Sequence, residues 1–167
     1  MIAMALDIRM FGDPVLKTRA APVESFDGAL ANLAQEMLAT MREHEGVGLA
    51  ANQVGRLKRI LVAAVKDEEF VLVNPVVEHG SETAEKELEG CLSIPGILVE
   101  VERPTEVVIS GQDPSGAQVR LEATGLVARI FQHEIDHLDG VLILDRTDRE
   151  SRKAAMRELR ERLLAQS

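Results

Sequence analysis

The sequence predicts an α+β fold in which antiparallel β-sheets surround a central helix, with an N-terminal helix and a C-terminal helix. Three observations lead to this prediction. Apolar residues recur with helical spacing over residues 27–44 and again after residue 147. Segments rich in β-branched residues lie between these regions and are separated by turn sequences, as in antiparallel sheets. A His-Glu-Ile-Asp-His sequence then lies in a third segment with helical spacing.

The first half of the chain contains one clear helix. A short strand is expected near residues 8–10, before turns at Gly12-Asp13-Pro14 and Pro22. The helix over 27–44 has Ser25 or Asp27 as candidate caps and ends at Gly46. Its apolar face has helical spacing and consists of Leu30, Leu33, Ala34, Met37, Leu38 and Met41.

The middle of the chain is predicted to be mostly antiparallel β-structure. Residues 58–65 and 70–77 flank a polar turn and indicate a hairpin. Residues 81–88 are strongly acidic, which suits an exposed edge or loop. Further short strands are expected over residues 97–101, 105–109 and 119–123, with Pro104 between the first two.

The last third of the chain is predicted to be mainly helical. The central helix follows Thr124 as candidate N-cap and stops at Gly140, and residues 141–144 are expected to form one more strand. The capping-box sequence Thr147-Asp148-Arg149-Glu150 opens the terminal helix. The predicted apolar face of this helix is Ala155, Met156, Leu159 and Leu163.

Length and composition limit the possible protein classes. A chain of 167 residues has the size of one domain, so a single domain over residues 1–167 is expected. The net charge of −9 argues against direct DNA binding and against binding to anionic membranes. No stretch approaches 18 apolar residues, and the apolar segment 1–6 is too short for a signal peptide. One cysteine excludes an intrachain disulfide, and a cytoplasmic location is expected.

The His-Glu-Ile-Asp-His sequence predicts a metal site. On a helix, His133 and His137 lie one above the other and can bind one metal ion, with Glu134 beside them as a base. Leu126, Ile130 and the two histidines fall on one helical stripe, so the histidines are expected to point inwards. A divalent cation would offset the acidic residues there.

A catalytic site of this kind needs a third protein ligand, and the sequence offers three candidates. A metzincin-like third histidine is excluded because Ile143 occupies its position. Glu158 has the spacing of a thermolysin-like ligand but lies in a basic helix, where a solvated role is more common. Cys91 lies in Glu89-Gly90-Cys91-Leu92-Ser93-Ile94-Pro95-Gly96, between turn-forming residues that could present a thiolate to a metal.

A glycine-rich segment at residues 46–55 is the third notable feature. It lacks the lysine of a P-loop, so phosphate binding is not expected. Gln53 in this segment could donate its amide N–H to a developing oxyanion.

Three segments together resemble the peptide deformylase family. They are GVGLAANQVG at residues 46–55, EGCLSIPG at 89–96 and QHEIDHLDG at 132–140. The similarity extends to GDPVLK at 12–17 and to 99–104, so it covers nearly the whole chain. The resemblance implies a single catalytic domain of the bacterial group with a helical C-terminus. It also implies a metal-dependent hydrolase that removes the N-formyl group from the N-terminal formylmethionine of nascent polypeptides, releasing formate.

The resemblance also implies residue roles. Cys91, His133 and His137 match the metal ligands and Glu134 the general acid/base, while Gln53 and the backbone N–H of Leu92 match the oxyanion donors. The family uses Fe²⁺, although Zn²⁺, Ni²⁺ or Co²⁺ can occupy the site. The methionine side chain would need an apolar slot, and the residues expected to line it are Val47, Gly48, Leu126 and Ile130.

Several points stay open at the level of sequence. Glu89 is hypothesised to pair with Arg103 and brace the cysteine loop, while the orientation of Arg129 is undetermined. The terminal region from residue 146 has seven basic and four acidic residues, which indicates a solvated helix or a surface that docks on the ribosome. The competing functions are a thermolysin-like peptidase, a structural metal-binding module and a cysteine nucleophile aided by histidine.

Overall fold

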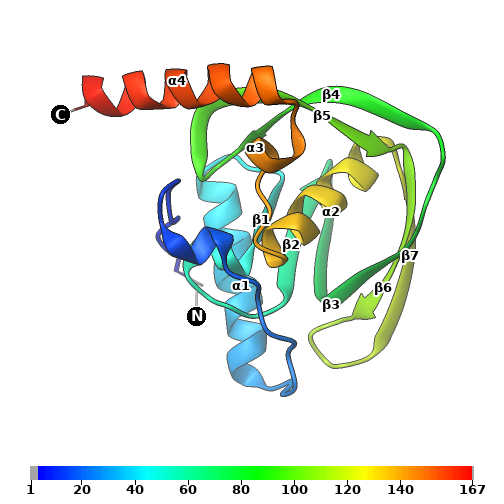
Figure 1. Cartoon of the computed structure of the whole chain (residues 1–167). Helices are drawn as coiled ribbons and strands as arrows, with labels where there is room; N and C mark the ends of the chain where they lie inside the picture. Colours follow the sequence, from blue (N-terminus) through cyan, green and yellow to red (C-terminus); the bar gives the residue numbers. More distant parts are fainter. Residues whose placement is uncertain (1–3, 167) are drawn as a thin grey trace.

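The computed structural model of the chain describes residues 4–166, and its largest element is a five-stranded antiparallel sheet (Figure 1). The spatial order is β1 (Gly48–Ala50), β2 (Ile60–Val65), β3 (Glu68–Gly80), β6 (Glu106–Gln112) and β7 (Gln118–Thr124). A second antiparallel sheet consists of β4 (Ala84–Cys91) and β5 (Ile94–Pro104). Residues 1–3, the first half of the apolar segment 1–6, and residue 167 lie outside the described residues. The predicted α+β class and the β2–β3 hairpin are confirmed.

Two helices cover opposite faces of the large sheet. They are α1 (Gly28–Glu43) and α2 (Gly125–Leu138). Side chains alternate along a strand, so β2 contributes to two separate cores. Leu61 and Ala63 belong to the core that includes α2, whereas Ile60 and Val62 belong to the core that includes α1. The central helix is thereby fixed against one face of the sheet.

The second sheet contributes a third core with the C-terminal helices. These are the single-turn helix α3 (Ile143–Arg146) and α4 (Arg149–Ala165). Val99 and Val101 of β5 belong to one apolar cluster with Ala155 and Leu159 of α4. The acidic residues of 81–88 are Glu82, just before β4, and Glu85 and Glu87 on it, and all three are exposed, as expected. The two short 3-10 helices are η1 (Pro14–Lys17) and η2 (Ala51–Val54).

Local hydrogen bonds explain where the longer helices begin. The Asp27 side chain accepts a hydrogen bond from Leu30 N–H at 3.1 Å and caps α1. Thr124 occupies the predicted N-cap position of α2. At α4 the cap is Asp148, which accepts from Ser151 N–H, rather than Thr147 at the start of the predicted capping box. Within residues 4–166, none of the helices combines the length and apolar composition needed to cross a membrane.

Two predicted strands are wrong. Residues 8–10 form an irregular segment, in which Arg9 N–H donates to Gln53 O, and the next bond goes from Phe11 N–H to Ser93 O. These bonds reach two different loops, so no ladder can form. Residues 141–144 were expected to be extended, but α3 begins at Ile143. The Asp145 side chain accepts from Leu142 N–H at 2.9 Å and stabilises this turn.

The predicted apolar face of α4 is correct only over its first half. Ala155 and Leu159 are buried, and Met156 packs partly against the same core. Leu163 is 57% exposed, so its assignment to the buried face is wrong. The reason is visible in Figure 1, where the C-terminal part of α4 extends beyond the β4–β5 sheet.

Candidate metal centre

The three predicted ligands lie together. Cys91 is the last residue of β4, and His133 and His137 lie on successive turns of α2. Their donor atoms are all within 4.8 Å of one another. The two Nε2 atoms are 3.2 Å apart, and Cys91 Sγ is 3.4 Å from His137 Nε2. Cys91 and His137 are 46 residues apart in sequence, so two distant elements present one sulfur and two nitrogens to the same point.

These separations fit a bound cation. A tetrahedral ion with bonds of about 2.0–2.1 Å to nitrogen and about 2.3 Å to sulfur holds its donors about 3.3–3.6 Å apart. Two of the three donor separations, 3.2 and 3.4 Å, are close to these values, and the third is within 4.8 Å. Burial lowers the pKa of His137 well below its usual value, so its imidazole is neutral and available as a ligand.

Glu89 fixes the tautomer of His133. Burial would raise the pKa of this carboxyl, but hydrogen bonds from Arg103 and His133, together with their charges, lower it to about 2. Glu89 is therefore ionised and can only accept hydrogen bonds. Its Oε1 lies 2.9 Å from His133 Nδ1, so Nδ1 carries the proton. With the Nδ1 proton held in this way, a cation bound at the centre would take the lone pair of Nε2, the atom that faces the other ligands.

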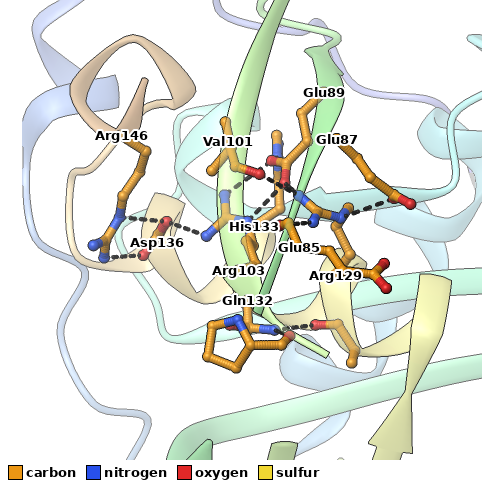
Figure 2. Close-up of polar contacts among 12 residues, drawn as sticks. Glu85, Glu87, Glu89, Val101, Arg103, Arg129, Gln132, His133, Asp136 and Arg146 are labelled. Carbon is orange, nitrogen blue, oxygen red and sulfur yellow. Dashed lines mark hydrogen bonds and ion pairs between the residues drawn. The ribbon is translucent and has the colours of Figure 1, made fainter. Parts of the chain in front are cut away.

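Arg103 connects both carboxylates around the metal ligands (Figure 2). Its Nε and Nη2 donate to Glu89 at 2.7 and 2.9 Å, and its Nη1 donates to Asp136 at 2.8 Å. Arg146 closes the network from α3 by donating to both Asp136 oxygens. The hypothesised contact between Glu89 and Arg103 is therefore present. It belongs to a chain of charges that leads from a metal ligand to the surface.

Arg129, whose orientation the sequence left undetermined, is buried against the same network. Its Nη1 donates to Glu89 Oε2 at 2.5 Å and to Val101 O at 2.9 Å, and its Nη2 donates to Glu85 O at 2.8 Å. Glu87 forms an ion pair with its Nε. Arg129 thus ties the helix that carries the histidines to both strands of the small sheet (Figure 2).

Glu134 lies beside the ligands in a buried position. The residue is 4% exposed, and its Oε1 has no hydrogen-bond partner among the described residues. Burial raises the pKa of its carboxyl to about 7, and a cation at the adjacent donors would lower this pKa again. Its other oxygen lies directly against Gly48, where any Cβ would collide with the carboxylate. Gly48 therefore shapes the space of Glu134 as well as the pocket wall.

Gln53 and Leu92 lie next to the ligand Cys91. The Gln53 side chain is buried, and its Nε2 is 3.5 Å from Cys91 Sγ. Leu92 directly follows Cys91 in the turn between β4 and β5, and its side chain packs against Gly46. The glycine-rich segment and the cysteine segment therefore meet at the metal centre, as their proposed roles require.

A cavity of about 570 Å³ opens onto this centre. Its lining contains His133, Glu134, Gln53 and Cys91, so these four residues border open space. All four residues expected to line an apolar slot border this cavity. Val47 and Leu126 are exposed, whereas Gly48 and Ile130 are more buried. Leu88 and Arg129 also line the cavity, and the sequence did not predict their place there.

The competing third ligand is excluded. Glu158 lies on α4 and accepts hydrogen bonds from Arg162, with its side chain 50% exposed. Among the described residues, the only cluster of His, Cys, Asp or Glu side chains suited to hold a metal is Cys91, His133 and His137. A thermolysin-like site would need a carboxylate in this cluster.

Comparisons with known proteins agree with this site. The profile of the family described as polypeptide deformylase matches residues 5–153, which include all three motif segments. The chain belongs to the polypeptide deformylase family. Such an enzyme is a metal-dependent amidohydrolase that removes the formyl group from formylated nascent peptides, and this chain binds its metal through Cys91, His133 and His137.

Individual deformylases match over almost their full length. The chain is 48% identical to the peptide deformylase of Dictyoglomus thermophilum over 151 residues, covering 90% of this chain and 97% of the relative. It is 49% identical to peptide deformylase 1 of Corynebacterium efficiens over 158 residues, covering 92% and 94%. The crystal structure of the peptide deformylase from Thermus thermophilus superposes with a TM-score of 0.91 at 42% identity, covering 96% of each chain.

The contact between Gly48 and Glu134 yields a first prediction. In Gly48→Ala the new methyl group must displace the carboxylate of Glu134, which is expected to be the acid and base of the reaction. A shift of about 1 Å in such a group can cost about 100-fold in rate. We expect kcat for formate release to fall about 100-fold while the bound metal is retained. Gly28→Ala is the matched control, because a Cβ there meets nothing within 4 Å. Equal rates for both variants would show that Glu134 needs no fixed position.

The buried network yields a second prediction. Arg103→Ala leaves Glu89 and Asp136 without their shared partner, and breaking a buried ion pair costs about 3–5 kcal/mol. We expect a loss of this size in the free energy of unfolding, measured by urea denaturation. Arg120→Ala removes ion pairs whose side chains are mostly exposed and should cost at most about 1 kcal/mol. A loss equal to that of Arg120→Ala would contradict a structural role of the network.

Proposed function

We propose that Glu134 is the general acid and base of the deformylation reaction, with Gln53 and the Leu92 backbone N–H as oxyanion donors. A divalent cation held by Cys91, His133 and His137 supplies Lewis acidity and lowers the pKa of a water molecule. The observation that supports this assignment most strongly is the buried Glu134 carboxyl group. Glu134 lines the cavity next to the ligands, and its Oε1 has no hydrogen-bond partner among the described residues. A buried oxygen without a partner is free to take a proton from water.

In the proposed reaction, Glu134 carries one proton from the water molecule to the leaving nitrogen. Glu134 accepts a proton as the water oxygen forms a bond to the formyl carbon. The negative charge on the formyl oxygen is met by the Gln53 amide and the Leu92 N–H, which donate hydrogen bonds to it. Glu134 then gives its proton to the peptide nitrogen as the carbon–nitrogen bond breaks. The products are formate and a free N-terminal amine.

We propose that the side chain next to the formyl group is methionine, held in the apolar wall of the cavity. Val47, Leu126 and Ile130 provide aliphatic surface, and Gly48 leaves room between them. An unbranched thioether fills an irregular apolar slot well. For the metal we propose Fe²⁺, since a mixed thiolate and imidazole set accepts this ion as well as Zn²⁺, Ni²⁺ or Co²⁺. We further propose that residues 1–167 act as one catalytic domain in the cytoplasm, where nascent chains are made.

The deciding experiment is formate release from a formyl-Met peptide by protein purified without oxygen, with its metal content measured. Glu134→Gln should keep the metal and lose turnover at least about 100-fold, because the base is removed while the ligands remain. Cys91→Ser should lose the metal, and Glu158→Gln, the matched carboxylate control, should change neither. Full turnover in Glu134→Gln, or loss of metal in Glu158→Gln, would contradict the assignment.

We also propose that α4 docks on the ribosome. A groove along this helix is lined by Arg149, Arg152, Lys153, Met156, Arg157 and Arg160. The fully buried residues of the helix, Ala155 and Leu159, belong instead to the core shared with β5. Five cations along one helix face suit the phosphates of structured RNA. The enzyme would then be bound close to the site where its substrate, the nascent chain, leaves the ribosome.

The test of docking is a charge substitution on this face. In a variant with Arg149→Gln, Lys153→Gln and Arg157→Gln, co-sedimentation with ribosomes should weaken at least about 10-fold, with a shallower salt dependence. Formate release from a short free peptide should stay unchanged. The matched control replaces three exposed cations outside α4, namely Arg19, Lys58 and Arg120, by Gln. Equal weakening in both variants would indicate general charge attraction and contradict docking through α4.

A further inference from the structure

The orientation of the Gln53 side-chain amide is determined by one backbone group. Ala50 N–H donates to Gln53 Oε1 at 3.0 Å. A backbone N–H can only donate, so the oxygen of the amide must face Ala50 and the nitrogen must face the opposite way. The usual ambiguity between oxygen and nitrogen in a glutamine amide does not arise here.

The amide nitrogen has two neighbours for its two hydrogens. Gln53 Nε2 lies 3.2 Å from Ser93 Oγ and 3.5 Å from Cys91 Sγ. Ser93 is fully buried, so its hydroxyl is shielded from water. If one N–H is held by Ser93, the other faces the sulfur, on the side of the metal ligands.

We propose that Ser93 is a positioning residue for deformylation, which holds the Gln53 amide so that one N–H faces the metal centre. The inference rests on the proposed role of Gln53 as oxyanion donor. The last torsion of a glutamine side chain is soft, so a single hydrogen bond at Oε1 lets the amide swing. A second hydrogen bond at Nε2 fixes its plane. Preorganised donors contribute most to an oxyanion site because they need no reorganisation during the reaction.

The backbones of Gln53 and Ser93 are held by hydrogen bonds from residues 9–11. Arg9 N–H donates to Gln53 O at 2.7 Å, and Phe11 N–H donates to Ser93 O at 2.8 Å. These two donors are two residues apart, so they set the distance between the glycine-rich loop and the cysteine turn. Substitution of the Ser93 side chain leaves these backbone bonds in place. It therefore tests the hydroxyl group and not the position of the loop.

In Ser93→Ala we expect kcat to fall about 10-fold and KM to change less than about 2-fold. The donor remains but loses its fixed orientation, so the loss is smaller than the factor of about 10²–10³ for removing an oxyanion donor. The effect falls on kcat because the contact strengthens only as charge develops. The Co²⁺-loaded variant should keep the absorption bands of the parent enzyme, because Ser93 is not a ligand. Thr40→Val is the control for loss of a buried hydroxyl that hydrogen-bonds Glu36 O, outside the site.

A double-mutant cycle with Gln53→Leu decides the question. If Ser93 acts through Gln53, then Ser93→Ala lowers kcat in the parent enzyme and changes it less than about 2-fold in the Gln53→Leu background. An equal loss in both backgrounds, or shifted Co²⁺ bands, would overturn the proposal, because Ser93 would then act through the fold or through Cys91. An unchanged kcat in Ser93→Ala, with a large loss in Gln53→Leu, would overturn the role of Ser93 alone. An unchanged kcat in Gln53→Leu would overturn the oxyanion assignment itself, and the positioning role with it.

Discussion

The carboxylate of Glu89 joins the two parts of the molecule that must meet at the metal. It lies on β4, two residues before the sulfur ligand, and it accepts hydrogen bonds from Arg103, Arg129 and His133. Two of these donors belong to α2 and one to β5. A buried carboxylate is costly unless its oxygens are satisfied, and here both are, by cationic or polar donors. The requirement to satisfy Glu89 thus holds sulfur and imidazoles at one point.

The sheet provides the rigid support for this arrangement. Because α2 packs on one face of β2 and α1 on the other, the helix with the histidines cannot shift without disturbing two cores. The β4–β5 sheet is fixed from the far side by Ala155 and Leu159 of α4. Sites built on such packed elements hold reacting groups more precisely than sites on loops. The cavity side of the metal centre is bordered by the glycine-rich segment. The absence of a side chain at Gly48 leaves room there for the Glu134 carboxylate.

The sequence predicted those parts of the site that depend on local periodicity or on a recognisable motif. His133 and His137 follow from helical spacing, and the three motif segments led to Cys91 and Gln53. The orientation of Arg129 was not predictable, because its partners are strand carbonyls 28 and 44 residues away. Ser93 was missed for the same reason, since its partner Gln53 is 40 residues away. The segments 8–10 and 141–144, which were wrongly predicted as strands, have no ladder partner. Leu163 fits the helical pattern, but the small sheet ends before it.

The large sheet is synthesised before the helix that covers one of its faces. The strands of the large sheet all precede α2 in the chain, so Leu61, Leu72 and Ile109 have no cover on that face until residues 125–138 have left the ribosome. During that interval an aliphatic surface is open to other chains, and such surfaces aggregate. Production of this enzyme at high rate is therefore expected to depend on chaperones or on low temperature. Truncations before residue 125 should be insoluble rather than partly active.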